Sequence, residues 1–265
     1  MLKLYDNIAS VAAQKVRMTL HEKGQTWETA SVDLRNGEVM NEEYLRLNPN
    51  GVVPTLIHDG QVLTESTAII EYLDEVFPQP PLKPATPLAR HRMRLWTKRI
   101  DEEVHRATGV LSQAIYIRFA HVEKTPAELD AYFARMPDKD REARQRSAIK
   151  LGMDAPEFAL ALRTFSRFID DLDRQEAASA WLAGDAFTLA DIACAPYVKR
   201  LEMLAMEAMW THGRRPHAAR WWAAMKARSS YRVEVEEKFP AGMSKVMLER
   251  GQVAWGRVGE MLGIV

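Results

Sequence analysis

The sequence has very little cysteine and no long apolar run. Cys194 is the single cysteine in 265 residues, which excludes an internal disulfide and a metal site built from several cysteines. No apolar stretch approaches the roughly 18 residues that a membrane-spanning helix needs. The N-terminal segment reaches Asp6 before any apolar run of signal-peptide length, so we expect no secretory signal. These absences predict a cytoplasmic protein that has no membrane partner.

The chain also lacks an excess of either charge. Its 36 Lys and Arg residues equal its 36 Asp and Glu residues, so the net charge gives no support for a nucleic-acid partner. The composition is 47% hydrophobic and 27% charged, which is typical of globular proteins. A chain of this length can bury a substantial core without a structural metal, in one large domain or two ordinary ones.

Residues 1–80 alternate between short apolar strands and helical stripes. A helical stripe recurs every four residues and stops at Gly24, a normal C-terminal stop. Two short apolar runs around Asp59–Gly60 predict a β-hairpin. The order β-α-β-α-β-β-α predicts a mixed sheet with helices on both faces. The expected strands and helices begin with Leu2–Tyr5, the stripe Ala12, Val16 and Leu20, Trp27–Leu34 and Glu42–Leu47.

The pattern changes after a proline-rich connector, within which we take residues 81–87 as the linker. Residues 88–265 are expected to be all-helical, beginning with one long helix from Met93 to Ala114. Residues 122–157 are strongly charged and contain prolines, so we interpret them as a surface insertion with short helical pieces. The predicted fold class is α/β plus all-α. Further helices are expected at Phe158–Leu172, Thr188–Met206, Trp221–Ala227 and Ser244–Val265.

The turn and hairpin around Pro54 carry the strongest signal for a ligand. Asn48–Gly51 is a dense turn signal, and Pro54 has no N–H to donate to a sheet ladder. We predict a cis Val53–Pro54 bond, which turns the backbone N–H and C=O of Val53 outward. An extended peptide could then add there as an extra strand. The alternative is that Pro54 is merely an edge proline.

Glu65 and Ser66 stand where the second hairpin strand is expected to meet a helix N-terminus. Free N–H groups and the helix dipole favour a carboxylate at such a position. We expect the hydroxyl and N–H of Ser66 to hold this carboxylate, and Glu65 to accept a hydrogen bond from an ammonium. The alternative is that Ser66 is only the N-cap of the helix. Together with Val53, these residues indicate a site for a peptide that ends in an α-amino acid group, a description that glutathione fits.

Two runs in this region, Asn48–Leu56 and Leu63–Leu73, resemble the glutathione-binding signature of the cytosolic glutathione transferases. Thr188–Asp191 resembles the capping box in the helical domain of that family, in which Asp191 would reach back to the backbone of Thr188. The resemblance covers both halves of the chain. It implies a thioredoxin-like glutathione-binding domain over residues 1–80, an all-helical domain, glutathione as co-substrate, no metal and a homodimer.

In this family a hydroxyl or thiol near the start of the first helix activates the sulfur of glutathione. The resemblance gives this role to Ser10, which would donate a hydrogen bond to the thiolate with help from the helix N-terminus. The alternative for Ser10 is a simple N-cap. Asn7, Tyr5 and the backbone N–H groups of the helix remain as other donors. Cys194 falls in an apolar helical run and is expected to be a buried core thiol.

The sequence offers several groups that could hold the glycine carboxylate of glutathione. Val52 stands where relatives often have Lys or Gln. Gln14, Lys15 and His58 remain as alternatives.

A second resemblance, on Arg94–Glu102 and the charged insertion, is to bacterial glutathione-dependent β-etherases. It covers mainly residues 60–160, and a gapless alignment places the reactive position of that branch nearer Ala13. It implies an aromatic substrate and a role in detoxification or the degradation of aromatic compounds. Asp101 would reach the amino group of a glutathione bound by the partner subunit, or it is an ordinary charge on a helix surface.

The resemblance therefore implies attack by the glutathione thiolate on an electrophilic, aromatic small molecule. We expect this second substrate to bind between the domains. One rival hypothesis is a non-catalytic protein of the same fold that binds glutathione or hydrophobic ligands, and another is a regulatory module without glutathione affinity. The residues expected to line the pocket are Ile8, Val104, His105, Thr108 and Leu111, each of which could equally belong to the core.

Overall fold

The computed structural model describes residues 1–121, 124–177 and 179–264. Its sheet has four strands in the order β2-β1-β3-β4. β1 runs parallel to β2 and antiparallel to β3, and β3 and β4 form the expected hairpin. The predicted strand over Trp27–Leu34 is shorter than expected. The strands are β1 (Leu2–Asp6), β2 (Glu28–Ser31), β3 (Thr55–His58) and β4 (Gln61–Leu63).

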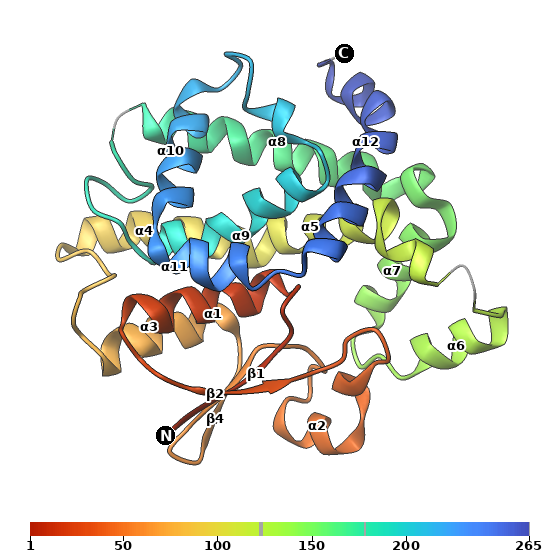
Figure 1. The fold of residues 1–265 in the computed structure, drawn as a ribbon, viewed down its shortest axis with the longest axis horizontal. Coiled ribbons are helices and arrows are strands. Elements are labelled where there is room, and N and C mark those ends of the chain that lie inside the picture. Colours follow the sequence, from red (N-terminus) through yellow and green to blue (C-terminus); the bar gives the residue numbers. More distant parts are fainter. Residues whose placement is uncertain (122–123, 178, 265) are drawn as a thin grey trace.

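Three α-helices accompany this sheet. The first and third lie together between the sheet and the helical domain, whereas the second lies near the lower edge of the view (Figure 1). The element order β-α-β-α-β-β-α agrees with the sequence prediction. These helices are α1 (Val11–Glu22), α2 (Glu42–Leu47) and α3 (Ser66–Val76), and a 3₁₀ turn spans Glu38–Met40.

The expected long helix consists of α4 (Pro87–Arg99) and α5 (His105–Ile115), joined without a break by the π-helical turn Ile100–Val104. No helix within the described ranges is long and apolar enough to cross a membrane. The remaining helices of this domain are α6 (Pro126–Ala134), α7 (Lys139–Leu151), α8 (Pro156–Glu176), α9 (Leu189–Met203), α10 (Pro216–Ala227), α11 (Ser229–Tyr231) and α12 (Ala241–Leu262). Shorter 3₁₀ or π turns lie at Ile117–Ala120, Gly152–Asp154, Glu207–Met209 and Arg232–Glu237.

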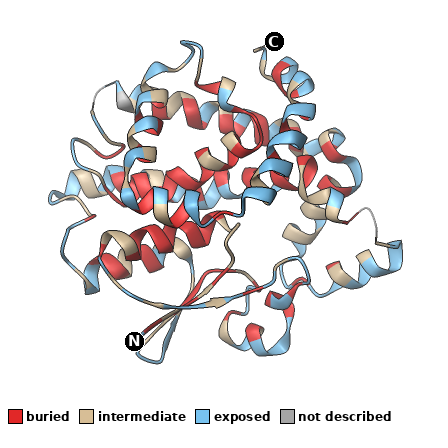
Figure 2. Ribbon diagram, in the orientation of Figure 1, coloured by how far each residue is buried: buried red, intermediate tan, exposed pale blue. Residues whose placement is uncertain are grey.

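Helix α9 forms the centre of the core, and buried residues concentrate along it and along α1 (Figure 2). The capping box at its start is confirmed: the N–H of Thr188 donates to the Asp191 carboxylate at 2.9 Å. The same carboxylate accepts from the N–H of Leu182 and the indole N–H of Trp221. Cys194 is fully buried, as expected. Because α1 packs against α9, this helix supports the start of α1, where the candidate site lies.

The charged insertion is more than a surface feature. Residues 122–123 lie outside the described part, but α6 and α7 supply the expected helices. Phe133 of α6 is fully buried and packs with residues of the first domain in a second apolar cluster. The insertion therefore supports the first domain, because its apolar residues complete a core that the small sheet cannot close alone. The other buried members of the cluster are Val32, Val39, Met40, Tyr44, Val53, Met136 and Ile149.

Candidate functional site

The turn before Pro54 is held in place by the side chains of Tyr44 and Asn48. The carbonyl of Val52 accepts from the hydroxyl of Tyr44 at 2.8 Å and from Nδ2 of Asn48 at 2.9 Å. Burial raises the pKa of Tyr44 to about 12, so this hydroxyl keeps its proton at neutral pH. The predicted cis Val53–Pro54 bond is confirmed.

The next residue, Val53, is only 7% exposed. Its backbone N–H and C=O nevertheless make no hydrogen bond within the described ranges. A buried backbone group without a partner is costly. Val53 therefore presents one donor and one acceptor to a ligand that lies alongside it, as in strand addition.

The N-terminus of α3 excludes the alternative that Ser66 is only a helix cap. Glu65, with φ 65°, is the N-cap residue, and Ser66 is the first residue of the helix, so Ser66 does not cap it. The N–H groups of Ser66, Thr67 and Ala68 have no partner among the described residues, and the first N–H of this helix with a backbone acceptor is that of Ile69. Free N–H groups at a helix N-terminus bind anions. Ser66 is thus available to a carboxylate.

An acidic cleft of about 560 Å³ lies beside this helix start. At its edge the Thr67 hydroxyl donates to Asp101 at 2.9 Å, and Nζ of the buried Lys15 donates to Thr67 at 2.9 Å. Burial lowers the pKa of Lys15, opposed by the nearby Asp101 carboxylate. Asp101 is about half exposed, with a side-chain exposure of 47%. Four carboxylates line the cleft, those of Glu65, Glu71, Glu75 and Asp101. Glu71 is paired with Arg94 and Glu75 with Lys83, so Glu65 and Asp101 are the ones that suit an ammonium group.

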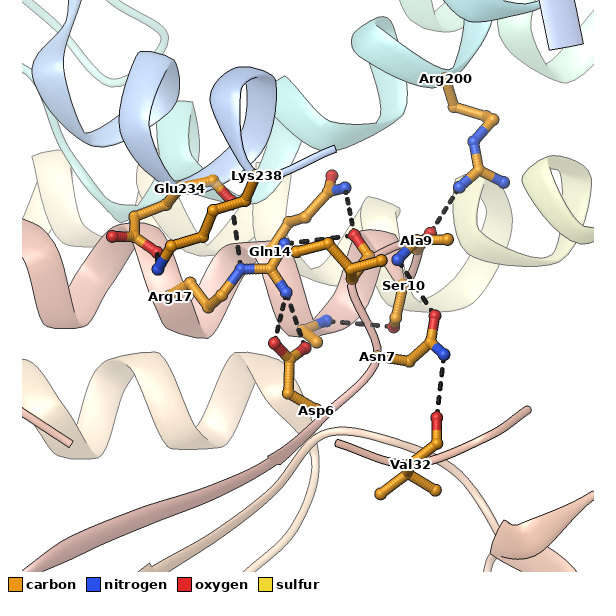
Figure 3. Close-up of polar contacts among 12 residues, drawn as sticks. Asp6, Asn7, Ala9, Ser10, Gln14, Arg17, Val32, Arg200, Glu234 and Lys238 are labelled. Atoms are coloured by element: carbon orange, nitrogen blue, oxygen red, sulfur yellow. Dashed lines mark hydrogen bonds and ion pairs between the residues drawn. The ribbon is translucent and has the colours of Figure 1, made fainter. Parts of the chain in front are cut away.

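Ser10 stands at the start of α1 and is its N-cap. Its Oγ accepts from the N–H of Ala13 at 3.2 Å (Figure 3). This contact uses an oxygen lone pair and leaves the hydroxyl proton free to donate. The N-cap role and donation to a thiolate are therefore compatible. Ala13, the position favoured by the gapless alignment, is fully buried and has no hydroxyl.

The loop that carries Ser10 is fixed by buried polar groups (Figure 3). The Arg17 guanidinium pairs with Asp6 at 2.6 Å and also donates to the carbonyl of Ile8 at 3.3 Å. From the helical domain, Arg200 donates to the carbonyl of Ala9 at 2.6 Å. No local pattern in the sequence marks either arginine for this role. The loop is therefore rigid before any ligand arrives.

The two other side-chain candidates, Asn7 and Tyr5, differ in how far their polar atoms are engaged. Nδ2 of Asn7 donates to the Val32 carbonyl at 2.9 Å, and its Oδ1 accepts from the N–H of Ala9 at 3.0 Å. The Tyr5 ring packs edge-on against Tyr44, with ring centroids 5.8 Å apart. The hydrogen bonds of Asn7 favour Ser10 over Asn7, whereas the ring contact of Tyr5 does not occupy its hydroxyl, so Tyr5 stays an alternative donor.

The three alternatives for the glycine carboxylate are placed unfavourably. Lys15 is fully buried and bound to Thr67. Gln14 is 1% exposed and donates to the Ile8 carbonyl at 3.4 Å. His58 ends β3 at its far end from Pro54 and contacts the Tyr72 hydroxyl at 2.8 Å.

The expected second-substrate wall needs correction at three positions. Val104, Thr108 and Leu111 are at most 3% exposed, because they lie on the helix face that packs into the core. Ile8 and His105 keep solvent access. Desolvation by the surrounding protein, with a smaller effect of Lys15, lowers the pKa of His105 to about 4.

Comparisons with known proteins assign the chain to a family. The model of the glutathione S-transferase N-terminal domain matches residues 9–76, and that of the C-terminal domain matches residues 139–224. Protein LigF from Sphingobium sp. strain SYK-6 is 32% identical over 197 residues, which cover 72% of this chain and 75% of LigF. The chain belongs to the glutathione S-transferase family.

The solved structures lead to the same family. The crystal structure of beta-etherase LigF from Sphingobium sp. strain SYK-6 superposes with a TM-score of 0.81 at 27% identity, covering 89% of this chain and 99% of LigF. A stringent starvation protein A homolog from Pasteurella multocida is 41% identical over 102 residues, 38% of this chain and 47% of that protein. The predicted fold class is confirmed, and the protein is a glutathione-dependent transferase.

Proposed function

We propose that this transferase binds glutathione as an extra strand beside Val53, with its γ-glutamyl end at the start of α3. The observation that carries the proposal is the buried, unpaired backbone of Val53. The carboxylate of the γ-glutamyl group meets the free N–H groups and the hydroxyl of Ser66. Its ammonium meets Glu65, and in a homodimer Asp101 reaches the ammonium of a glutathione bound by the partner subunit.

Ser10 then donates its hydroxyl hydrogen bond to the glutathione sulfur. The thiol proton is released to solvent on binding, and the thiolate is stabilised by this hydrogen bond and by the N-terminus of α1. Orientation and charge stabilisation account for the catalysis, with no metal in the proposed mechanism.

The second substrate is an electrophilic aromatic molecule, and β-aryl ether cleavage is the specific reaction we favour. The thiolate attacks the carbon that carries the aryloxy group, so that a carbon–sulfur bond forms and the carbon–oxygen bond breaks. The aryloxide leaves and takes a proton from solvent. The similarity to LigF supports this choice, and Ile8 and His105 would contact the aromatic ring in the interdomain cleft.

A homodimer in the cytoplasm is the assembly and location we propose. The exposed side chains of Leu88 and Leu95 on α4 support association of two copies through this helix. The single, buried thiol of Cys194 suits a reducing compartment. Sedimentation at micromolar concentration tests the assembly, and a monomeric mass would count against the shared role of Asp101.

The function is tested by incubating the protein and glutathione with two electrophiles, a β-aryl ether ketone and 1-chloro-2,4-dinitrobenzene. We expect mass spectrometry to detect the glutathione thioether and the released phenol from the ether. If only the chloroarene yields a thioether, the protein is a glutathione transferase and the proposal of ether cleavage is wrong. No thioether from either, with glutathione still bound, would favour the non-catalytic binding protein.

A further inference from the structure

Arg141 of α7 lies beside the turn that precedes Pro54. Its Nη2 is 3.4 Å from the carbonyl oxygens of both Asn50 and Gly51. Both distances exceed the usual 2.7–3.2 Å of an N–H···O hydrogen bond. The guanidinium is therefore held near the glutathione-binding strand by weak contacts, although the two segments lie far apart in the sequence.

The donors of Arg141 are incompletely used. Its Nε is buried without a hydrogen-bond partner, and no ion pair of Arg141 occurs within the described ranges. The carboxylate of Asp138 instead accepts from the backbone N–H of Arg141 at 2.9 Å, as the cap of α7. A partly buried guanidinium with free donors is a site for a planar anion, because it binds carboxylates through two parallel hydrogen bonds.

The charge of Arg141 is also felt within the helical domain. The positive charge of Arg141 is one of several that lower the pKa of His105, behind desolvation and Lys15. The position of Arg141 is set by its contacts with Asn50 and Gly51, which place the guanidinium beside the turn that leads to Val53.

We propose that Arg141 binds the glycine carboxylate of glutathione, in place of the cation that is absent at Val52. This inference rests on the proposed glutathione site. With the γ-glutamyl group at Ser66 and the cysteinyl backbone at Val53, the glycine carboxylate lies within one residue of Val53, next to the turn that Arg141 contacts. A carboxylate there fills the unused donors of the guanidinium.

Arg135 of α6 offers a matched control. It also reaches the first domain, where Nη2 donates to the carbonyl of Gly37 at 3.0 Å and to Oδ1 of Asn41 at 2.8 Å. These are ordinary hydrogen-bond distances. Arg135 therefore uses its guanidinium to join the insertion to the first domain, and we do not expect it to bind a ligand.

Calorimetry measures the affinity of each protein for two ligands, glutathione and its glycine amide. The amide lacks the charge of the glycine carboxylate. The proteins are wild type, Arg141→Ala, Arg141→Lys and Arg135→Ala. We expect Arg141→Ala to weaken glutathione binding roughly 10- to 150-fold, the usual range for a charged hydrogen bond. The same variant should change binding of the amide by less than about 3-fold. Arg141→Lys should recover part of the affinity, and Arg135→Ala should keep the preference for the acid over the amide.

Thermal unfolding of each variant shows whether it is folded. If Arg141→Ala weakens both ligands equally, or neither, Arg141 only joins the domains and the inference is wrong. If wild type binds neither ligand, the proposed glutathione site fails and the inference fails with it.

Discussion

Arg200 of α9 donates from Nη2 to the carbonyl of Ala9 at 2.6 Å, which joins the helical domain to the loop that carries Ser10. Its Nη1 donates to the Ser112 hydroxyl at 2.9 Å. Burial lowers the pKa of Arg200 to about 10, so the guanidinium stays charged at neutral pH. A charged donor from one domain thereby sets the position of the proposed catalytic residue in the other.

Replacing this arginine should loosen that loop. Arg200→Ala removes a buried guanidinium with its hydrogen bonds to the half-buried Ala9 carbonyl and the buried Ser112 hydroxyl, and we expect a loss of about 2–4 kcal/mol in the free energy of unfolding. Urea denaturation measures it. Arg174→Ala, at a side chain that is 74% exposed, is the control and should stay within about 0.5 kcal/mol of wild type. A change in Arg200→Ala as small as that of the control would contradict the role of Arg200.

The second prediction concerns Ser10 and the thiolate. Ser10→Ala should raise the pKa of bound glutathione and lower kcat roughly 5- to 150-fold, which corresponds to about 1–3 kcal/mol for a lost neutral donor. Loss of the N-cap should also cost about 1 kcal/mol in stability. The measurements are kcat at saturating glutathione and the thiolate absorbance against pH. Ser10→Thr keeps a hydroxyl and should restore most of kcat, whereas full kcat in Ser10→Ala would leave Ser10 as a cap alone.

Ser66 should behave in the opposite way, because its proposed contact is with the γ-glutamyl carboxylate. Ser66→Ala should weaken glutathione binding by about 1–2 kcal/mol, roughly 5- to 30-fold, with a smaller effect on kcat at saturation. Since Ser66 is not the N-cap of α3, the stability of Ser66→Ala should stay near that of wild type. The KM for glutathione and the midpoint of thermal unfolding test this pair of results. A stability loss without a change in KM would mean that Ser66 serves the helix only.

The last prediction is a dependence of stability on pH. Desolvation lowers the pKa of His105 from its ordinary 6.5 to about 4, so the unfolded chain takes up this proton before the folded protein does. The contribution of His105 to the free energy of unfolding is therefore fully present above about pH 6.5 and is lost as the pH falls toward 4. His105→Gln should flatten that part of the profile in urea denaturation. Parallel profiles of the two proteins between these pH values would show that His105 titrates normally.

Much of the local structure could be predicted from short segments of sequence. The capping box of Thr188 and Asp191, the hairpin around Asp59–Gly60 and the cis bond before Pro54 all match the structure. Each depends on the backbone preferences of a few adjacent residues, which act in the same way in any fold. The glutathione signature around Val53 could be found for the same reason.

Errors arose where a local pattern allowed two outcomes. Val104 and Leu111 share the apolar face of one helix, and only the neighbours in space decide whether this face lines a cleft or the core; here it is the core. At Ser66 the conformation of Glu65, with φ 65°, moved the helix cap by one residue. Such differences depend on packing, which the spacing of apolar residues does not encode.

The sequence by itself determined the family, the two-part organisation and the residues of the glutathione signature, because these are written in contiguous motifs. Only the tertiary structure decided which distant side chains lie beside the loops of the candidate site. Arg200 lies 191 residues from Ala9 and Arg141 lies 90 residues from Gly51, so no local pattern connects them. They meet because the packing of α7 and α9 places these guanidinium groups beside backbone carbonyls of the first domain.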